Sequence, residues 1–387
     1  MREIERWASL LKSPRTFWHM LFSRRYRFSF DLMPIEIRHM SWKQRSNLVM
    51  YGLNLIYRRA FPWSWPIHMQ IELTNYCNLK CPICPTGQKS LNRPPTAIDV
   101  HLFEGLLNEV GPYLLTLALY AWGEPLLHPQ LSSILEIAGK YNIATILSTN
   151  GQNLDDDRVL NALLNSPTTY LIVAIDGLTD ETNSQFRVGA RLDPILRGVR
   201  QLATRKKNTG SAFPIIHMRY LVMNHNQHEY SAIKAFAVEH MFDFLSIRTL
   251  SPIDSPVTPY SEYLPQLNKF KAYQYNGDLR IRRHDFICMH AFSYPTVFSN
   301  GCVVSCEQDF NAQQPYGMLS DTLSFKDVWF GKPALQIRQN IRDNPSQYSF
   351  CLNCPFADRP ISSCSIEAHD LRKHNPSNII PLHGKIP

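Results

Sequence analysis

The sequence predicts an α/β fold built on a parallel sheet. From residue 67 onwards, six short runs of β-branched and apolar residues alternate with amphipathic segments of helical length. This alternation gives βα units, in which each helix returns the chain so that the next strand runs parallel to the last. The chain has 387 residues, 44% of them hydrophobic, which is enough to bury the core of one large domain or two. Six units leave two architectures open, an open doubly wound sheet and a partly closed barrel.

Each predicted strand is a short β-branched or apolar run, and each predicted helix is an amphipathic segment between two such runs. The predicted strands cover residues 67–74, 115–121, 144–148, 170–175, 215–222 and 244–248. The predicted helices cover residues 99–110, 131–141, 156–164, 194–206 and 230–240. In both architectures the functional site lies at the carboxyl ends of the strands.

The charge of the chain is concentrated before the first predicted strand. Residues 1–66 contain 12 basic and 4 acidic side chains, and the remaining residues contain 28 of each. Short helices are expected at 3–11, 16–22 and 42–59, without an alternating strand pattern. The apolar runs fall short of the roughly 20 residues that cross a bilayer, and residues 1–66 lack the pattern of a secretory signal. We therefore expect a cytoplasmic protein.

Nine cysteines lie in two groups separated by 203 residues without cysteine. An odd number at short spacings is poorly explained by disulfides and better explained by metal ligation in a reducing compartment. Cys77, Cys81 and Cys84 lie together on the loop after the first predicted strand. A structural zinc site needs four ligands, whereas three thiolates on a cubane cluster leave one iron open to another ligand.

The spacing CxxxCxxC, with Asn78 after the first cysteine and Ile83 before the last, resembles the signature of the radical S-adenosylmethionine (SAM) superfamily. The resemblance extends over residues 67 to about 250 and implies a partial (β/α)6 TIM-like barrel. It implies a 4Fe–4S cluster on Cys77, Cys81 and Cys84, with Ile83 beside the bound SAM. Electron transfer from such a cluster cleaves SAM to a 5′-deoxyadenosyl radical, which has to be kept from water.

Further roles follow from the same resemblance. The segment Gly123-Glu124-Pro125 resembles the family's GGEP motif, with Trp122 in place of the first glycine, and Glu124 would bind the methionine ammonium group. Ser148 and Asn150 would lie near the ribose or methionine portion of SAM.

Two charged residues complete the predicted SAM site. Arg187 would pair with the carboxylate of SAM. Asp176, in Asp176-Gly177, resembles the end of the family's SxDG strand, with Ala174 where serine is common.

The second cysteine group supplies four thiolates, Cys288, Cys306, Cys351 and Cys354. Considered alone they fit zinc, but their pattern resembles the SPASM/twitch extension of radical SAM enzymes and implies one auxiliary 4Fe–4S cluster, with a second as the alternative. Cys302 and Cys364 are left over and are expected to be buried thiols, and Trp329 is expected in the core.

The predicted domains are a basic aromatic helical extension (1–66), the radical SAM barrel (67–255), a linker (256–280), the SPASM/twitch domain (281–370) and a tail (371–387).

The expected reaction is hydrogen abstraction, in a dehydrogenation, dehydration or related radical reaction, from a small-molecule, sugar or lipid-linked substrate. The auxiliary cluster would aid oxidation or substrate positioning, and an external donor such as flavodoxin or ferredoxin would supply electrons. A peptide-modifying SPASM maturase is the alternative. A zinc-bearing nucleic-acid-binding or scaffold protein is the alternative from another class.

Aromatic residues alternate with basic ones in residues 1–66, and three interpretations remain open for this section. It is a helical cap packed on the barrel, a surface that lies on an anionic membrane, or an RNA-binding segment. The cap is favoured, peripheral contact with the inner membrane surface comes second, and we do not expect nucleic acid as a partner.

Overall fold

A computed structural model describes residues 18, 21–30, 33–57, 59–166, 168–250, 260–271, 273, 275–276, 279–281, 286, 288–355, 365–372 and 380–382. Its centre is a ten-stranded sheet with the order β13-β12-β11-β3-β4-β5-β6-β7-β8-β14. Neighbouring strands from β3 to β8 are parallel throughout. These six strands are β3 (His68–Ile71), β4 (Thr116–Ala118), β5 (Ala144–Thr149), β6 (Tyr170–Ala174), β7 (Ile215–Val222) and β8 (Phe244–Thr249).

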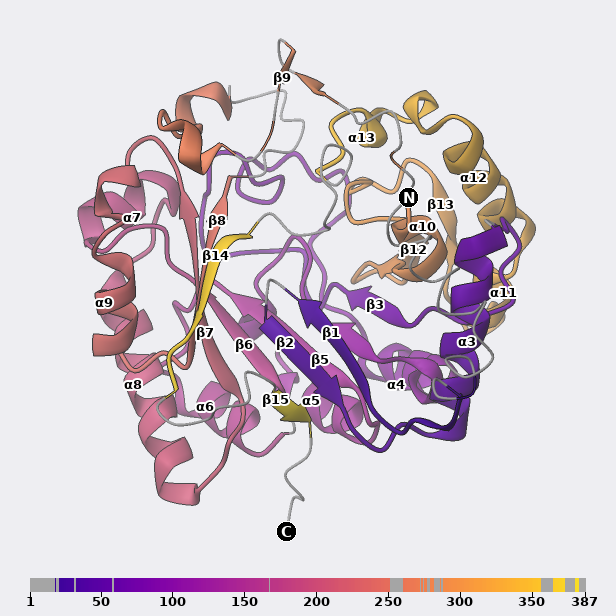
Figure 1. The fold of residues 1–387 in the computed structure, drawn as a ribbon, viewed down its shortest axis with the longest axis horizontal. Helices are drawn as coiled ribbons and strands as arrows, with labels where there is room; N and C mark the ends of the chain where they lie inside the picture. Colours follow the sequence, from indigo (N-terminus) through magenta and orange to yellow (C-terminus); the bar gives the residue numbers. More distant parts are fainter. Residues whose placement is uncertain are drawn as a thin grey trace.

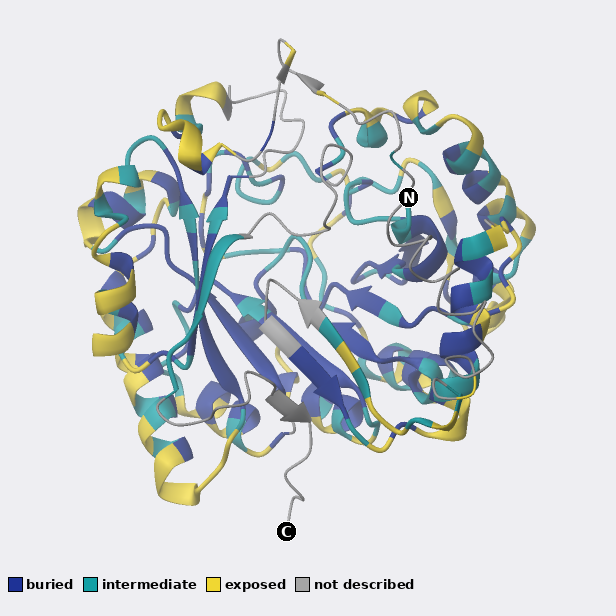
Figure 2. Ribbon diagram, viewed as in Figure 1, coloured by how far each residue is buried: buried dark blue, intermediate teal, exposed yellow. Residues whose placement is uncertain are grey.

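Helices cover the outer face of this curved sheet (Figure 1). They are α4 (Val100–Val110), α5 (Leu131–Gly139), α6 (Asp157–Leu164), α7 (Asp180–Phe186), α8 (Leu192–Thr209) and α9 (Ile233–Glu239). Figure 2 shows that they turn exposed faces outward, while the strands between them are buried. Leu147, Val173 and Met218 point outward from their strands into the core shared with the helices. Ile146, Ile172 and Ile215 belong to a second apolar cluster on the inner face.

All six predicted strands and all five predicted helices are confirmed, with small shifts at their ends. The predicted strand 215–222 coincides with β7. Two predicted helix starts are N-caps, because Asp99 and Asp156 accept backbone hydrogen bonds from the first turns of α4 and α6. The fold is the α/β partial barrel that was predicted.

The expectation that residues 1–66 contain only helices is wrong. Strands β1 (Tyr26–Phe30) and β2 (Met33–Ile37) form an antiparallel hairpin, which β15 (Ile380–Leu382) joins in parallel with β2. The hairpin lies across the inner face of the sheet (Figure 1), where Ile35 and Ile37 are buried against Ile146 and Tyr170. Of the three interpretations of this section, the described residues 21–30 and 33–57 form the packed cap.

The hairpin was not predicted from the sequence because its basic residues are typical of a solvent-exposed segment. Arg27 and Arg38 both pair with the buried carboxylate of Glu36, at 2.9 and 2.8 Å. Burial alone would raise the pKa of Glu36, but hydrogen bonds from the two arginines lower it. Arg27 and Arg38, which are typical of a solvent-exposed basic segment, therefore form ion pairs with a buried carboxylate of the hairpin.

The predicted helix at 42–59 is confirmed as α3 (Trp42–Tyr57), whereas the one at 3–11 and nearly all of the one at 16–22 lie outside the described residues. None of the helices described is long and apolar enough to cross a membrane.

The carboxyl-terminal part of the chain extends the same sheet. Strand β11 (Thr296–Val297) pairs in parallel with β3, and β12 (Cys302–Val304) and β13 (Pro315–Met318) follow in antiparallel order. Strand β14 (Ser365–Asp370) pairs antiparallel with β8 at the opposite edge. This part also contains helices α10 (His290–Ser293), α11 (Phe325–Trp329), α12 (Lys332–Asp343) and α13 (Ser349–Leu352), of which α11 and α12 pack against β13 (Figure 1). Trp329 is fully buried in the core, as predicted.

Candidate active site

The three-cysteine loop follows β3 at the carboxyl end of the barrel. Cys81 is buried, and Cys77 and Cys84 are half-buried. The loop is tightly wound: Cys84 N donates to Cys81 O at 3.2 Å, and Leu79 N donates to the Cys77 sulfur at 3.4 Å. A Cβ on Gly87 would come within 2.4 Å of the Cys81 carbonyl oxygen, so only glycine fits there. The backbone thus holds three thiols on one short turn.

The surroundings of Cys77 and Cys81 oppose ionisation of their thiols. Burial raises the pKa of Cys81 to about 12, although the nearby Arg187 lowers it. Burial also raises the pKa of Cys77, and the charges of Glu124 and Cys84 add to the effect. A cationic group is therefore needed to hold these two residues as thiolates, and the all-sulfur donor set of the loop suits iron–sulfur ligation.

No three histidine, cysteine or acidic side chains within the described part of the chain are grouped so that they could ligate a single metal ion. In a cubane cluster each thiolate binds a different iron, so the ligands need not converge on one point.

An amide network ties this loop to the loop after β5. Asn150 Nδ2 donates to Asn78 Oδ1 at 2.7 Å and lies 3.5 Å from the Cys77 sulfur. Asn78 Nδ2 in turn donates to Asn153 Oδ1 at 3.0 Å. Asn150, which was predicted to contact SAM, therefore contacts the cysteine loop itself. The amide at Asn78 was part of the recognised motif, but its partner could not be predicted from sequence.

Glu124 is buried between the loops that follow β4 and β5. Its carboxylate accepts from Thr149 Oγ1 at 2.7 Å, from Asn150 N at 2.7 Å and from Leu126 N at 3.0 Å. Burial raises the pKa of Glu124, whereas these hydrogen bonds lower it. The carboxylate proposed for the methionine ammonium group thus also fixes the position of Asn150.

The two residues that flank Glu124 are set by backbone geometry. A Cβ on Gly123 would lie 1.9 Å from the Thr74 carbonyl oxygen, so the close approach of these two loops requires glycine. Pro125 begins a 3-10 turn that extends to Leu127.

Arg187 and Asp176 form a partly buried ion pair, with Arg187 Nε 2.5 Å from Asp176 Oδ2. The charges of Cys81 and Cys84 act on the same guanidinium. The arginine predicted to bind the SAM carboxylate therefore lies beside the cysteine loop, where Asp176 orients it. Ser148 faces the barrel interior from β5, because it alternates with the outward-facing Leu147.

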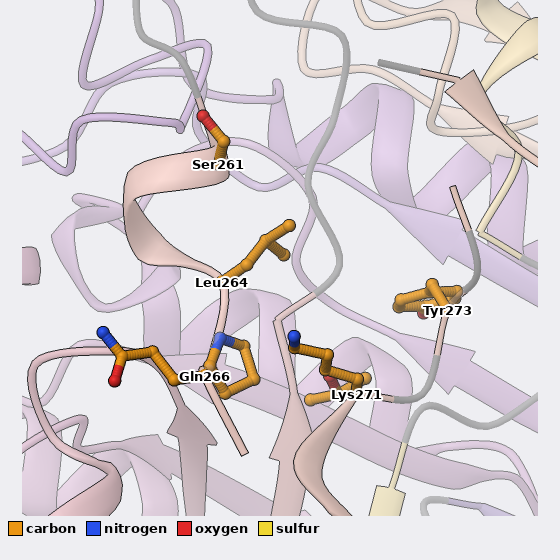
Figure 3. Close-up of a pocket in the computed structure, with 7 residues that line it drawn as sticks. Ser261, Leu264, Gln266, Lys271 and Tyr273 are labelled. Atoms are coloured by element: carbon orange, nitrogen blue, oxygen red, sulfur yellow. The ribbon is translucent and has the colours of Figure 1, made fainter. Parts of the chain in front are cut away.

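Ile83 is buried in an apolar cluster with Phe186, Met223 and Leu250. This cluster forms a wall between the cysteine loop and the segment after β8. Beyond it, a cavity of about 340 Å³ is bordered by Thr249, Leu264, Lys271 and Tyr273 (Figure 3). Leu264 packs against the Ile83 cluster and also borders the cavity. None of the predicted site residues borders the cavity.

The second cysteine group lies on the side of β3 where β11, β12 and β13 extend the sheet. Burial raises the pKa of Cys306 well above its ordinary value, and the nearby charges of Glu307, Cys354 and Cys288 add to the effect. Cys351 is half-buried in α13, three residues before Cys354, and packs against the main core. The structure thus brings Cys288, Cys306 and Cys354 together, with Cys351 on the adjoining helix.

The two remaining cysteines differ in what can be said of them. Cys302 is buried on β12 among Phe298, Val304 and Trp122, as expected of a structural thiol. Cys364 lies outside the described residues.

Glu307 is a candidate site residue that sequence reasoning missed. Its side chain is hydrogen-bonded to Gln70, and the charges of Arg248 and Arg219 act on it. Burial raises the pKa of Glu307, and these neighbours lower it. Gln70, Arg219 and Arg248 face the interior, because they alternate with outward-facing core residues on β3, β7 and β8, and Glu307 joins them from the second cysteine group. The sequence feature that could have identified Glu307 is its position directly after Cys306.

Glu72, directly after β3, belongs to a structural ion pair. Arg93 Nη1 and Nη2 bind its two oxygens at 2.6 and 2.9 Å, and Ser299 donates to it from the carboxyl-terminal part. Both charges are buried.

The comparisons with known proteins agree with this geometry. Residues 71–232 match the family model of the radical SAM superfamily. The chain is 26% identical over 145 residues to an Fe-coproporphyrin III synthase of Methanosarcina barkeri, covering 37% of this chain and 36% of that protein. It is 30% identical over 146 residues to a pre-heme d1 synthase of Dinoroseobacter shibae, covering 37% and 35%. It is 25% identical over 138 residues to the mycofactocin maturase MftC of Mycobacterium tuberculosis, covering 36% and 34%. The match spans about a third of the length of each of these relatives.

Two solved structures share the fold. The structure of Streptococcus suis SuiB bound to S-adenosylmethionine matches with a TM-score of 0.56 and 18% identity, over 80% of this chain and 76% of that one. Tagged anSMEcpe with bound AdoMet matches with a TM-score of 0.51 and 17% identity, over 76% and 86%. With its cysteine loop at the carboxyl end of a six-stranded parallel barrel, the chain contains a radical SAM domain, and that fold implies a 4Fe–4S cluster and SAM as cofactors.

Proposed function

We propose that the chain is a radical SAM enzyme whose first cluster binds to Cys77, Cys81 and Cys84. A cluster held there supplies the electron that cleaves SAM to methionine and a 5′-deoxyadenosyl radical, which then takes a hydrogen atom from the substrate. The observation that carries the proposal is the grouping of three cysteines, the Glu124 loop, the Asn150 loop and Arg187 at one end of the barrel.

The protein's own residues orient SAM in this proposal. Glu124 accepts a hydrogen bond from the methionine ammonium group in addition to those that hold Asn150. Arg187, oriented by Asp176, pairs with the SAM carboxylate through guanidinium N–H groups other than Nε. Ser148 and Asn150 contact the ribose or methionine portion. The apolar wall that contains Ile83 borders the adenosyl group and excludes water.

An auxiliary 4Fe–4S cluster binds to Cys288, Cys306, Cys351 and Cys354 in this proposal. It accepts an electron from the substrate radical or orients the substrate, which lies in the interior between the two cysteine groups. Flavodoxin or ferredoxin serves as the electron donor, in the cytoplasm.

We propose a small-molecule, sugar or lipid-linked substrate that carries a carboxylate or phosphate. Arg219 and Arg248 both act on Glu307 in the interior, and guanidinium groups at this position favour an anionic group on the substrate. The hairpin β1–β2 fills the amino-terminal end of the barrel, so the substrate enters from the carboxyl end, beside the cavity bordered by Lys271.

A peptide substrate is the second candidate. The relatives include both a PqqA peptide cyclase of Gluconobacter oxydans and the Fe-coproporphyrin III synthase, so peptides and small molecules are both represented by name.

Iron analysis after anaerobic purification tests the cofactor assignment. We expect about eight irons per chain and absorbance near 400 nm, as two cubane clusters require. Replacing Cys81 by alanine should abolish 5′-deoxyadenosine formation from SAM and dithionite. The matched control is Cys302→Ala, which removes a buried thiol that belongs to neither proposed ligand set and should retain SAM cleavage. Zinc without visible absorbance, or full cleavage in Cys81→Ala, would refute the proposal.

We also propose that the outer face of α3 contacts an anionic membrane surface. Trp42, Met50 and Tyr57 are exposed along this helix, and residues 38–66 contain no acidic side chain. Arg45 lies over the Trp42 ring at 5.3 Å, which places a cation beside an exposed aromatic, as at membrane interfaces.

Liposome co-sedimentation tests this contact. The variant Trp42→Ser/Tyr57→Ser should lose most binding to vesicles containing phosphatidylserine. The control Val238→Ser changes an exposed apolar residue on α9, on another part of the barrel, and should bind as the wild type does. Equal binding by both variants, or binding to RNA but not to vesicles, would exclude the membrane contact.

A further inference from the structure

Trp122 departs from the family's motif, and its side chain reaches the second cysteine group. It occupies the first glycine position of the motif that continues through Gly123 and Glu124. Its indole Nε1 donates to the carbonyl oxygen of Glu307 at 2.9 Å, across 185 residues of sequence. Glu307 directly follows Cys306. The loop that carries the proposed SAM-binding carboxylate therefore bonds directly to the segment that carries a proposed cluster ligand.

The bonded carbonyl belongs to the peptide unit that also contacts the Cys306 sulfur. The carbonyl of Glu307 and the N–H of Gln308 form one planar peptide group. Burial raises the pKa of Cys306, and the Gln308 N–H, which lies beside its sulfur, opposes this effect. Trp122 therefore holds one end of a peptide group whose other end faces the Cys306 sulfur. A donor at the carbonyl polarises the peptide and strengthens its N–H as a donor.

The contacts around this peptide hold it in place from the side of the SAM loop. The Trp122 ring packs edge-on against Phe310, with 6.1 Å between ring centroids. Thr86, two residues after Cys84, donates to the Trp122 carbonyl. Arg93 Nε donates to the carbonyl of Phe310 at 3.0 Å. The segment from Cys306 to Phe310 is thus held by contacts with Trp122, in the Glu124 loop, and with Arg93, which follows the first cysteine loop.

We propose that Trp122 is a positioning residue that tunes the cluster bound by Cys306 through the Glu307–Gln308 peptide. Hydrogen bonds to cluster sulfurs stabilise the reduced, more negative state and raise the reduction potential. Trp122, which replaces a glycine of the family's motif, therefore connects the SAM-binding loop to the reduction potential of the second cluster. This inference rests on the proposed function, because it requires a cluster at the second cysteine group.

The test uses the full chain with Cys77, Cys81 and Cys84 all replaced by alanine, so that only the second cluster contributes. An EPR-monitored redox titration compares residue 122 as Trp, Phe and Gly. Trp122→Phe keeps an aromatic ring and removes the indole N–H, and Trp122→Gly restores the family's residue. Both variants should have a more negative midpoint potential than the parent and altered g-values.

Two controls separate this role from general packing. Trp329→Phe removes an indole N–H that donates to a backbone carbonyl, that of Ser64 at 3.0 Å, in the main core. Phe310→Leu removes the ring that packs against Trp122 and leaves the indole N–H in place. Both should keep the parent potential.

The outcomes separate this inference from the proposal it rests on. Loss of iron in Trp122→Phe but not in Phe310→Leu would also support the inference, because the indole bond would then be needed to place Cys306. A Trp122→Phe potential equal to that of the parent, or an equal shift in Trp329→Phe, would overturn it. Absence of iron from the triple-cysteine parent would instead refute the second cluster, and the inference with it.

Discussion

Thr149 and Glu124 are joined side chain to side chain, with the threonine hydroxyl 2.7 Å from the glutamate Oε1. The bond connects the loop after β4 to the last residue of β5, and the glutamate is buried. A carboxylate assigned to ligand binding is thus also part of the scaffold that places the neighbouring loop.

We therefore expect Glu124→Gln to weaken SAM binding at least tenfold, or about 1.4 kcal/mol. The amide loses the negative charge, and its NH2 group would face N–H and O–H donors. Thr149→Val, which removes one donor and keeps the charge, should cost only a few-fold. Anaerobic calorimetry with SAM measures both, and equal affinities for Glu124→Gln and the wild type would contradict this role.

Gly123→Ala should abolish SAM cleavage while the chain still binds iron. The added Cβ would lie 1.9 Å from the Thr74 carbonyl oxygen, so the Glu124 loop would have to move. Gly105→Ala is the matched control, because a Cβ there meets nothing within 4 Å on the exposed face of α4. It should raise the free energy of unfolding by up to about 1 kcal/mol. Normal 5′-deoxyadenosine formation by Gly123→Ala would show that this close approach is dispensable.

Arg93→Ala should lower the free energy of unfolding by about 3–5 kcal/mol, because it leaves the Glu72 carboxylate buried and unpaired. Arg158→Ala removes an exposed partner of Asp156 instead and should cost less than about 1 kcal/mol. Urea denaturation of the two variants gives the comparison. Similar losses in both would mean that the Glu72–Arg93 pair contributes no more than a surface pair.

The stability of the protein should decrease as the pH falls below about 6.5. Burial lowers the pKa of His68 and of His290 to about 4. The unfolded chain therefore binds protons that the folded chain excludes between pH 6.5 and about 4. Each histidine then contributes a slope of up to about 1.4 kcal/mol per pH unit, with full stability above this range.

His68→Gln tests this pH dependence, since it removes one of the two groups. The free energy of unfolding of the variant should fall less steeply than that of the wild type between pH 7 and pH 5. Parallel curves for the two proteins would show that His68 does not contribute.

Local sequence patterns were sufficient to predict the barrel but not the hairpin that covers its inner face. Strand β7 was predicted to the residue because Ile215 to Val222 is a β-branched, apolar run between polar turns. The hairpin β1–β2 was missed because Arg27 and Arg38 suggest solvent, and only the fold shows that both pair with Glu36.

The same limit applies to the site. Spacing identified the three-cysteine loop, and strand ends indicated where Glu124 and Asn150 would gather. The bond from Trp122 to Glu307 joins residues 185 positions apart, and such pairings depend on topology that periodicity does not encode.

The two outer strands of the barrel acquire their last partners late in synthesis. Strand β3 pairs with β11, whose first residue is Thr296, and β8 pairs with β14, whose first residue is Ser365. Until those residues leave the ribosome, a nascent barrel presents two unpaired edges that can bind other chains. Biogenesis should therefore depend on protection of these edges, and premature termination before residue 365 should give aggregates rather than a smaller folded enzyme.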